Sequence, residues 1–413
     1  MFCCGTNLNV FSQNKTNHTF VVKARMAHPA PRWRADGLKT CLLLNFDRRG
    51  WVRASSVEDM DFYWASVANI RQLFSPETRF RLRERQLINH FQNHFELTRK
   101  DLMCRNLKRY RRDMEKEGSV RPGELDFLPT TYHLPADIGL LVEEFRRNAA
   151  EFGEAKSRAM WIIKPSSAAQ GKGIVIINSL AQAKRWAAKL ASSQFARDTG
   201  YVCSRYISNP LLIGGRKFDL RIFVLVTSYR PLKVWLHEEG FARFCLQKYR
   251  NDSSSLDNPY MHLTNVAIQK KGAGYNAVHG GKWSTRHLRL FVDGTRGAGS
   301  GDLLFERIEQ LIVHSLKAVQ TVIVHNKHCF ECYGYDVLVD DDLNPYLIEV
   351  NASPSLSSTT VADRQLKTQV IGDILDVLAT PAWYGEEGLR MGANTCTEQQ
   401  VGGFKLIYDE KDS

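Results

Sequence analysis

The sequence predicts a mixed fold of the α/β (α+β) class with two or three lobes. From about residue 161 onward, short runs rich in valine, isoleucine and aromatic residues alternate with longer segments of helical period. The chain has 413 residues, 43% of them hydrophobic, which is enough for lobes that share a core.

The N-terminal third predicts a leader and then a small lobe. Residues 1–38 are polar and rich in asparagine and threonine, so we expect a poorly ordered leader. In the small α/β lobe that follows, at 39–155, segments 40–46 and 61–67 are predicted strands. Segments 80–91, 96–118 and 135–150 are predicted helices.

The helix at 96–118 is strongly basic and ends at Gly118. Its cations are Lys100, Arg105, Lys108, Arg109, Arg111 and Arg112. Such a run is either a solvated helix face or a docking surface for an acidic partner.

Beyond residue 160 the predicted strands dominate, and one long helix interrupts them. The strands are WIIKP, GIVIIN, YVCSRYI, FDLRIFVLVTS, LKVWLHEEGFARF, YGYDVLV and YLIEVN. The helix, at 300–324, carries apolar residues on one face, which predicts that it lies buried against a sheet.

The last two strands are predicted to form a hairpin around an acidic turn at 341–344. In that register, an apolar face pairs Tyr335 with Val350, Val337 with Ile348 and Val339 with Tyr346.

The other face of this hairpin would then carry Asp336 opposite Glu349, with Asn351 two residues further along. Like charges that face each other are destabilising, so a shared proton or a cation must compensate. Three converging oxygen ligands suit Mg²⁺, which also holds substrate phosphates. A polar face satisfied without metal is the alternative.

The segment WIIKPSSAAQGKGIVIIN predicts a strand, a glycine-bearing loop and a second strand. Lys164 ends the first strand, and Lys172 lies at the tip of the loop between Gly171 and Gly173. Glycines let the backbone approach phosphate oxygens, and the lysines add positive charge. An ordinary hairpin turn would fit this short segment equally well.

Taken together, these segments resemble the ATP-grasp arrangement, in which two mainly antiparallel sheets hold a nucleotide. The strings WIIKP, QGKGI, NPLLIGGRKFDLRIFVLV, HLTNVAIQK, HGGKW and YGYDVLVDDDLNPYLIEVNASPSL resemble the tubulin tyrosine ligase-like family, most closely its short polyglutamylase branch. The resemblance implies a family domain at 39–380, with a central ATP-grasp lobe at 156–235, a C-terminal lobe at 236–380, and a C-terminal tail at 381–413.

The resemblance also implies site residues. The nucleotide contacts would be Lys164, Gln170, Gly171, Lys217, Asp219, Thr264 and Asn265, together with Ser204, Arg205, Tyr206 and Ile207, which would form the hinge that borders adenine. Asp336, Glu349 and Asn351 would hold Mg²⁺, Arg243 and Lys282 would receive glutamate, and Lys172, Arg221 and Glu349 would serve catalysis.

The expected function is ATP- and Mg²⁺-dependent addition of glutamate to tubulin C-terminal tails through an acyl phosphate. A tubulin glycylase, a ligase for another acidic protein, and a non-catalytic microtubule- or nucleic-acid-binding protein are the alternatives. The net charge of +12 allows an anionic partner but does not identify it.

The expected partners are tubulin tails, microtubules, glutamate and accessory glutamylase subunits, without nucleic acid. No long apolar run or signal-peptide pattern appears, so we expect no membrane partner. The expected location is the cytoplasm and cytoskeleton, including a ciliary axoneme or basal body.

Overall fold

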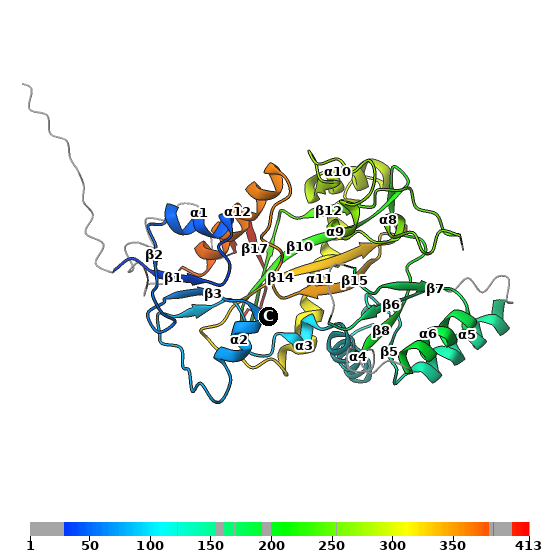
Figure 1. Ribbon diagram of the computed structural model, residues 1–413, viewed down its shortest axis with the longest axis horizontal. Helices are drawn as coiled ribbons and strands as arrows, with labels where there is room; N and C mark the ends of the chain where they lie inside the picture. The colour runs from blue at the N-terminus through cyan, green and yellow to red at the C-terminus, as the bar shows by residue number, and fades with distance from the viewer. Residues whose placement is uncertain are drawn as a thin grey trace, which may run out of the picture.

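Three β-sheets follow one another along the long axis of the molecule (Figure 1). The protein is described from a computed structural model, which places residues 29–121, 123–152, 160–167, 171–191, 200–252, 254–379, 383 and 399–412. None of the helices in these ranges is both long and apolar enough to cross a bilayer.

The first sheet is parallel and belongs to the N-terminal lobe. Its order is β2 (Val52–Arg53), β1 (Arg32–Ala35), β3 (Phe62–Trp64) and β4 (Leu87–Ile88). β1 lies within residues 29–38, which the sequence assigned to the leader, whereas residues 1–28 lie outside the described ranges.

Two predictions in this lobe are wrong. Segment 40–46 belongs to helix α1 (Thr40–Arg48), whose buried Cys41, Leu42, Asn45 and Phe46 recur with helical period. Segment 80–91 contains β4 and chain without regular structure instead of a helix. Its Arg81 and Arg83 are exposed while Phe80 and Leu82 are half-buried, an alternation of period two and not of a helix.

The second sheet has nine strands, and the long β10 (Arg216–Tyr229) is its spine. One path runs β13 (Lys282–Ser284), β12 (Phe241–Phe244), β10, β11 (Leu232–His237), β17 (Phe404–Asp409) and β16 (Gln400–Val401). On its other edge β10 pairs with β14 (Glu331–Val339), which pairs with β15 (Pro345–Asn351), and β9 (Leu212–Ile213) also pairs with β10.

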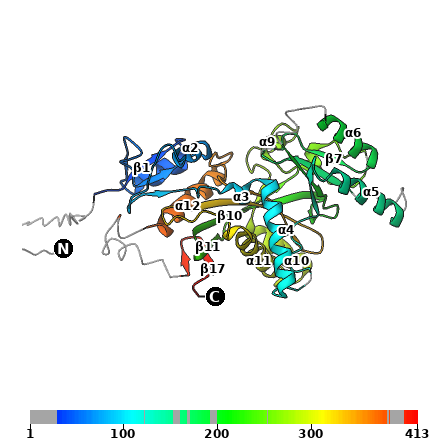
Figure 2. The ribbon, with the colours of Figure 1, turned by 90° about the horizontal axis from the view of Figure 1, so that it is seen from below.

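Alternate residues of β10 face two different cores. Leu220, Ile222 and Val224 pack with α11 (Ser300–Gln320) and α4 (Lys100–Glu117), whereas Phe223 and Leu225 pack with α1 and α12 (Val361–Val377). The predicted apolar face of the helix at 300–324 is buried in the first core, as expected. Seen from below, α4 crosses this region beside α11 (Figure 2), and α11 in turn packs against α10 (Thr285–Arg296).

The third sheet is antiparallel and has the order β5 (Thr131–Leu134), β8 (Tyr201–Arg205), β6 (Trp161–Pro165) and β7 (Val175–Ile177). Helices α5 (Ile138–Phe152) and α6 (Leu180–Ala191) cover it.

The predicted strands beyond residue 160 and the predicted helices at 96–118 and 135–150 are therefore confirmed. Four short helices complete the described fold: α2 (Val67–Leu73), α3 (Phe95–Thr98), α8 (Pro259–His262) and α9 (Val266–Gln269).

Candidate active site

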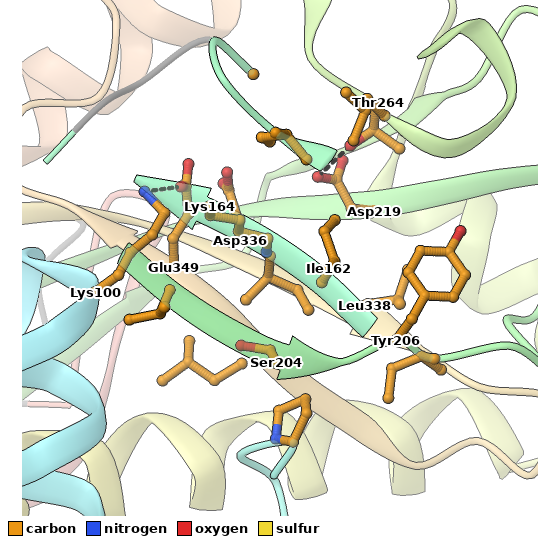
Figure 3. A pocket seen from close by; sticks show the side chains of 18 of the residues that line it. Lys100, Ile162, Lys164, Ser204, Tyr206, Asp219, Thr264, Asp336, Leu338 and Glu349 are labelled. Carbon is orange, nitrogen blue, oxygen red and sulfur yellow. Dashed lines mark hydrogen bonds and ion pairs between the residues drawn. The ribbon is translucent and has the colours of Figure 1, made fainter. Parts of the chain in front are cut away.

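The pocket that the sequence predicts to hold a nucleotide, called the nucleotide pocket below, lies where the third sheet faces the β14–β15 hairpin and β10. It encloses ≈ 1060 Å³ of empty space, part of it open to solvent. Figure 3 shows carboxylates and lysines at one end of this pocket and apolar and aromatic side chains at the other. Ile162, Leu338 and Leu347 are among its apolar walls. The pocket therefore suits a ligand with one charged and one apolar end.

The hairpin brings Asp336 opposite Glu349 and Tyr335 opposite Val350, as the sequence predicted. Beyond this point the predicted register is wrong, because Val337 pairs with Leu347 and Val339 with Pro345. A β-bulge at Ile348 is the cause, and it brings Ile348 into the lining of the pocket beside Glu349.

Two arginines hold the buried carboxylate of Asp336. Arg221 contacts it from Nε at 2.7 Å and from Nη2 at 3.2 Å, and Arg243 Nη2 lies 2.8 Å from Oδ2. Burial alone would raise the pKa of Asp336, but the two guanidiniums outweigh burial and hold this pKa well below its usual range. Asp336 is therefore an anion available to a cation.

Glu349 is paired with a residue that the sequence analysis did not assign to the site. Lys100, the first residue of α4, places its Nζ 2.8 Å from Glu349 Oε2. Lys100 belongs to the basic helix, and no local signal in the sequence links this helix to Glu349, which lies 249 positions away. The third predicted ligand is Asn351. Its side-chain amide nitrogen donates to the carbonyl oxygen of Gly334 at 3.2 Å and lies 3.4 Å from Glu349 Oε1.

The donor set of Asp336, Glu349 and Asn351 fits a hard cation such as Mg²⁺. Two carboxylates face each other across the ladder, and the amide oxygen of Asn351 accepts no hydrogen bond from the described residues. Lys100 contacts Oε2 of Glu349, so Oε1 is the oxygen that no described lysine contacts, and it could serve a cation while that ion pair persists.

The loop between β6 and β7 supplies the expected phosphate side. Gly171 has φ +75°, and a Cβ added there would lie 2.6 Å from Ile268 Cδ1, so this position needs glycine. Burial lowers the pKa of Lys164 to about 8, against the opposing attraction of Glu349. Lys172 is exposed at the rim. Gln170 lies outside the described residues.

A relay of hydrogen bonds forms the opposite wall of the pocket. Lys217 Nζ donates to the Tyr206 hydroxyl at 2.9 Å, and this hydroxyl lies 2.9 Å from Nδ1 of His262. His262 Nε2 lies 3.0 Å from the carbonyl oxygen of Ser255, so Nε2 carries the proton and Nδ1 accepts from Tyr206. Sequence reasoning missed His262.

Asp219 links this wall to the hairpin. Thr264 Oγ1 donates to its Oδ2 at 2.6 Å, and Arg243 contacts both carboxylate oxygens while also reaching Asp336. The predicted hinge residues Ser204, Arg205 and Ile207 line the pocket, and so does Asn265.

Four predicted site residues do not line the nucleotide pocket. Arg221, Arg243 and Asn351 lie behind it and contact residues that do. Lys282 faces a different hollow, yet it is the ladder partner of Arg243 on the neighbouring strand.

Among the described residues, the lining of the pocket holds more cations than carboxylates. The cations are Lys100, Lys164, Lys172, Arg205 and Lys217, and the carboxylates are Asp219, Asp336 and Glu349. The excess of two positive charges suits a polyphosphate, because a divalent cation neutralises only part of the polyphosphate's negative charge.

A second buried pair supports the chain just beyond the hairpin. His90 Nδ1 lies 2.6 Å from Glu331 Oε1, and His90 Nε2 lies 3.2 Å from the hydroxyl of Ser353. Ser353 follows Asn351 by two residues, so the N-terminal lobe helps to position the end of the predicted metal-ligand strand.

Comparison with known proteins finds a matching family model and several similar chains. Residues 80–383 match the model of the tubulin-tyrosine ligase family. The probable alpha-tubulin polyglutamylase Ttll1 of Tetrahymena thermophila is 46% identical over 93% of this chain and 94% of its own length. The probable tubulin polyglutamylase TTLL9 of Bos taurus is 38% identical over 94% of this chain and 86% of its own length. The corresponding ttll-9 protein of Caenorhabditis elegans is 40% identical over 87% of this chain.

Proposed function

Because the chain belongs to the tubulin-tyrosine ligase family, we propose that it is a tubulin polyglutamylase, a ligase that uses ATP to add glutamate to glutamate side chains in tubulin C-terminal tails. The predicted ATP-grasp fold class and the predicted ligase activity hold. The observation that carries the proposal is the pairing of Asp336 with Glu349 beside the lysines of the nucleotide pocket.

The proposed reaction has two steps. ATP first transfers its γ-phosphoryl group to an acceptor carboxylate, which gives an acyl phosphate and ADP. The amine of the incoming glutamate then attacks the acyl carbon, the amide forms, and inorganic phosphate leaves. The first step concentrates negative charge, so positioning and charge neutralisation dominate catalysis.

The chain's own residues have separate tasks in this scheme. Lys164 and Lys172 neutralise the phosphates, while Lys217, Asp219, Thr264 and the hinge at 204–207 hold the rest of the nucleotide. Arg221 keeps Asp336 ionised and oriented. Mg²⁺ bound by Asp336, Glu349 and Asn351 would supply charge stabilisation on the phosphoryl oxygens.

The proposed partners are tubulin tails and, through them, microtubules. The relatives' names support tubulin as the substrate and the cytoskeleton as the place of action. A role at the axoneme or basal body and a need for accessory subunits belong to the same proposal, and co-purification of the tagged chain from ciliated cells tests both.

The decisive experiment measures incorporation of labelled amino acids into tubulin with ATP and Mg²⁺. We expect incorporation of glutamate, and none of glycine or tyrosine. Tubulin treated to remove its acidic tails is the matched control and should accept nothing. Preferential use of glycine, or equal labelling of tailless tubulin, would refute the proposal.

A further inference from the structure

A buried histidine and a buried glutamate lie behind an exposed serine just beyond β15. His90 Nδ1 lies 2.6 Å from Glu331 Oε1, and His90 Nε2 lies 3.2 Å from Ser353 Oγ. The side chains of His90 and Glu331 are 0% exposed, whereas Ser353 is exposed. A hydroxyl, an imidazole and a carboxylate in this order form an arrangement in which a serine can pass its proton to a buried base.

The hydrogen bonds around His90 determine its tautomer. Asn89 Oδ1 accepts from the Ala65 amide at 2.7 Å and Nδ2 donates to the Ala65 carbonyl oxygen at 3.2 Å, which fixes the orientation of the Asn89 side chain. The same Nδ2 lies 3.3 Å from His90 Nε2, so Nε2 carries no proton and Nδ1 donates to Glu331. The lone pair of Nε2 is therefore available to the proton of the Ser353 hydroxyl.

The surroundings of His90 favour a positive charge on its ring. Glu331 accepts from the Phe91 amide at 3.0 Å, and no lysine or arginine of the described chain forms an ion pair with it. Burial lowers the pKa of the neighbouring His94, whose ring centre lies 4.9 Å from that of His90, against the attraction of Glu331. A buried carboxylate without another cation stabilises the imidazolium that forms when His90 takes up a proton.

Ser353 lies close to the predicted metal ligands. It follows Asn351, which pairs with Gly334, by two residues, and two residues of chain span at most about 7 Å. The next residue, Pro354, is buried. A Cβ added at Gly334 would lie 3.2 Å from Pro354 Cβ and 3.3 Å from Arg221 Cδ. The Ser353 hydroxyl is therefore held beside β14 and still reaches solvent.

We propose that Ser353 is a catalytic residue that deprotonates the amine of the incoming amino acid, with His90 as the proton acceptor and Glu331 as the positioning residue behind it. This inference rests on the proposed function, whose second step needs an unprotonated amine. The α-amino group of a free amino acid is almost fully protonated at neutral pH, so a base is required.

Protons and electrons balance in this step. The ammonium group gives one proton to Ser353 Oγ while the Ser353 hydroxyl proton moves to His90 Nε2, so Ser353 keeps its charge. The freed lone pair of the nitrogen attacks the acyl carbon, the C–N bond forms, and the bond from the acyl carbon to phosphate breaks with its electron pair on phosphate. The departing phosphate takes the proton that the nitrogen loses on forming the amide, and His90 returns its proton to solvent through Ser353.

The test separates the two steps of the reaction in the full chain with tubulin, ATP and Mg²⁺. Hydroxylamine in place of glutamate traps the acyl phosphate as a hydroxamate, and it needs no base before it attacks because its nitrogen is largely unprotonated at neutral pH. We expect Ser353→Ala to lower kcat for glutamate about 100-fold while KM for glutamate and the rate of hydroxamate formation change less than about twofold. Ser353→Thr keeps a hydroxyl and should recover much of the loss. Ser119→Ala, the same change at an exposed position beyond α4, is the control.

A second readout is the pH dependence of the defect. Because solvent deprotonates the amine at higher pH, the loss of kcat in Ser353→Ala should shrink at least about threefold between pH 7 and pH 9, which a purely structural role does not predict. His90→Gln should behave in the same way, and if it does not fold, the Ser353 variants decide alone. Equal losses of hydroxamate and amide formation in Ser353→Ala, or no loss of either, would overturn this inference. A parent that forms neither product would overturn the proposed function itself.

Discussion

Charged side chains are buried both beside the nucleotide pocket and at the contact between β13 and α12, but the two regions hold them differently. Beside the pocket, Arg243 joins Asp219 to Asp336 through several short contacts. Between β13 and α12, Lys282 and Lys367 both contact Asp363. Planar guanidiniums fix the orientation of a carboxylate, whereas ammonium groups are point charges with little directional preference. The guanidinium contacts are therefore a rigid frame for the carboxylates, and the lysine contacts are not.

The largest expected effect comes from removing the negative charge of Glu349 in the nucleotide pocket. Glu349→Gln keeps the shape of the side chain and loses the carboxylate that Lys100 contacts. We expect ligation to fall by on the order of 100-fold or more, since one lost electrostatic contact costs about 3 kcal/mol of transition-state stabilisation. Glutamate incorporation and the thermal midpoint are measured together. Normal ligation by a folded variant would contradict this prediction.

The next effect contrasts the two regions directly through stability. Arg243→Met leaves two buried carboxylates short of a partner, so we expect the free energy of unfolding to fall by about 3–5 kcal/mol. Lys282→Met still leaves Lys367 as a partner for Asp363, so we expect a smaller loss, below about 3 kcal/mol. Urea unfolding of both variants checks the contrast, which fails if the losses are equal.

A smaller effect on the free energy of unfolding should appear at acid pH, through His262 in the wall of the nucleotide pocket. Burial, with help from nearby Lys217, lowers the pKa of His262 to about 4, below the value of about 6.5 expected in the unfolded chain. As the pH falls through that window, the unfolded chain takes up a proton that the folded chain excludes, so the free energy of unfolding decreases. The thermal midpoint should therefore drop more between pH 7 and pH 5 in the parent than in His262→Gln. Equal drops would exclude His262 as the cause.

The smallest effect concerns the exposed arginines of the basic helix α4, whose first residue, Lys100, reaches the nucleotide pocket. Lys108 and Arg109 contact carbonyl oxygens of Thr131 and Ala318, so only part of the predicted basic surface is free to dock a partner. Arg105 and Arg112 are exposed, and we expect their reversal to glutamate to weaken microtubule binding about 2–5-fold and to flatten its salt dependence. Reversal of Arg185, exposed on α6, is the control. Identical binding of both variants across salt would remove α4 from the docking surface.

The sequence predicted the elements whose signals are local and repeated. The strands beyond residue 160 and the helix at 300–324 follow periods that span many residues, and Asp336 opposite Glu349 follows from the hairpin register. The apolar run at 40–46 was too short to separate helix from strand. Lys100 at Glu349, and Asp363 between two lysines, depend on contacts between distant segments that no local pattern encodes.

The bulge at Ile348 has a consequence for the length of the chain. Deleting this one residue would let Val337 and Leu347 follow Asp336 and Glu349 in an uninterrupted ladder, a more regular sheet. The same deletion would remove a side chain from the wall of the nucleotide pocket. A one-codon deletion here would therefore improve strand pairing at the cost of ligand binding, so selection for activity should preserve the number of residues between the turn and Glu349 more strictly than their identity.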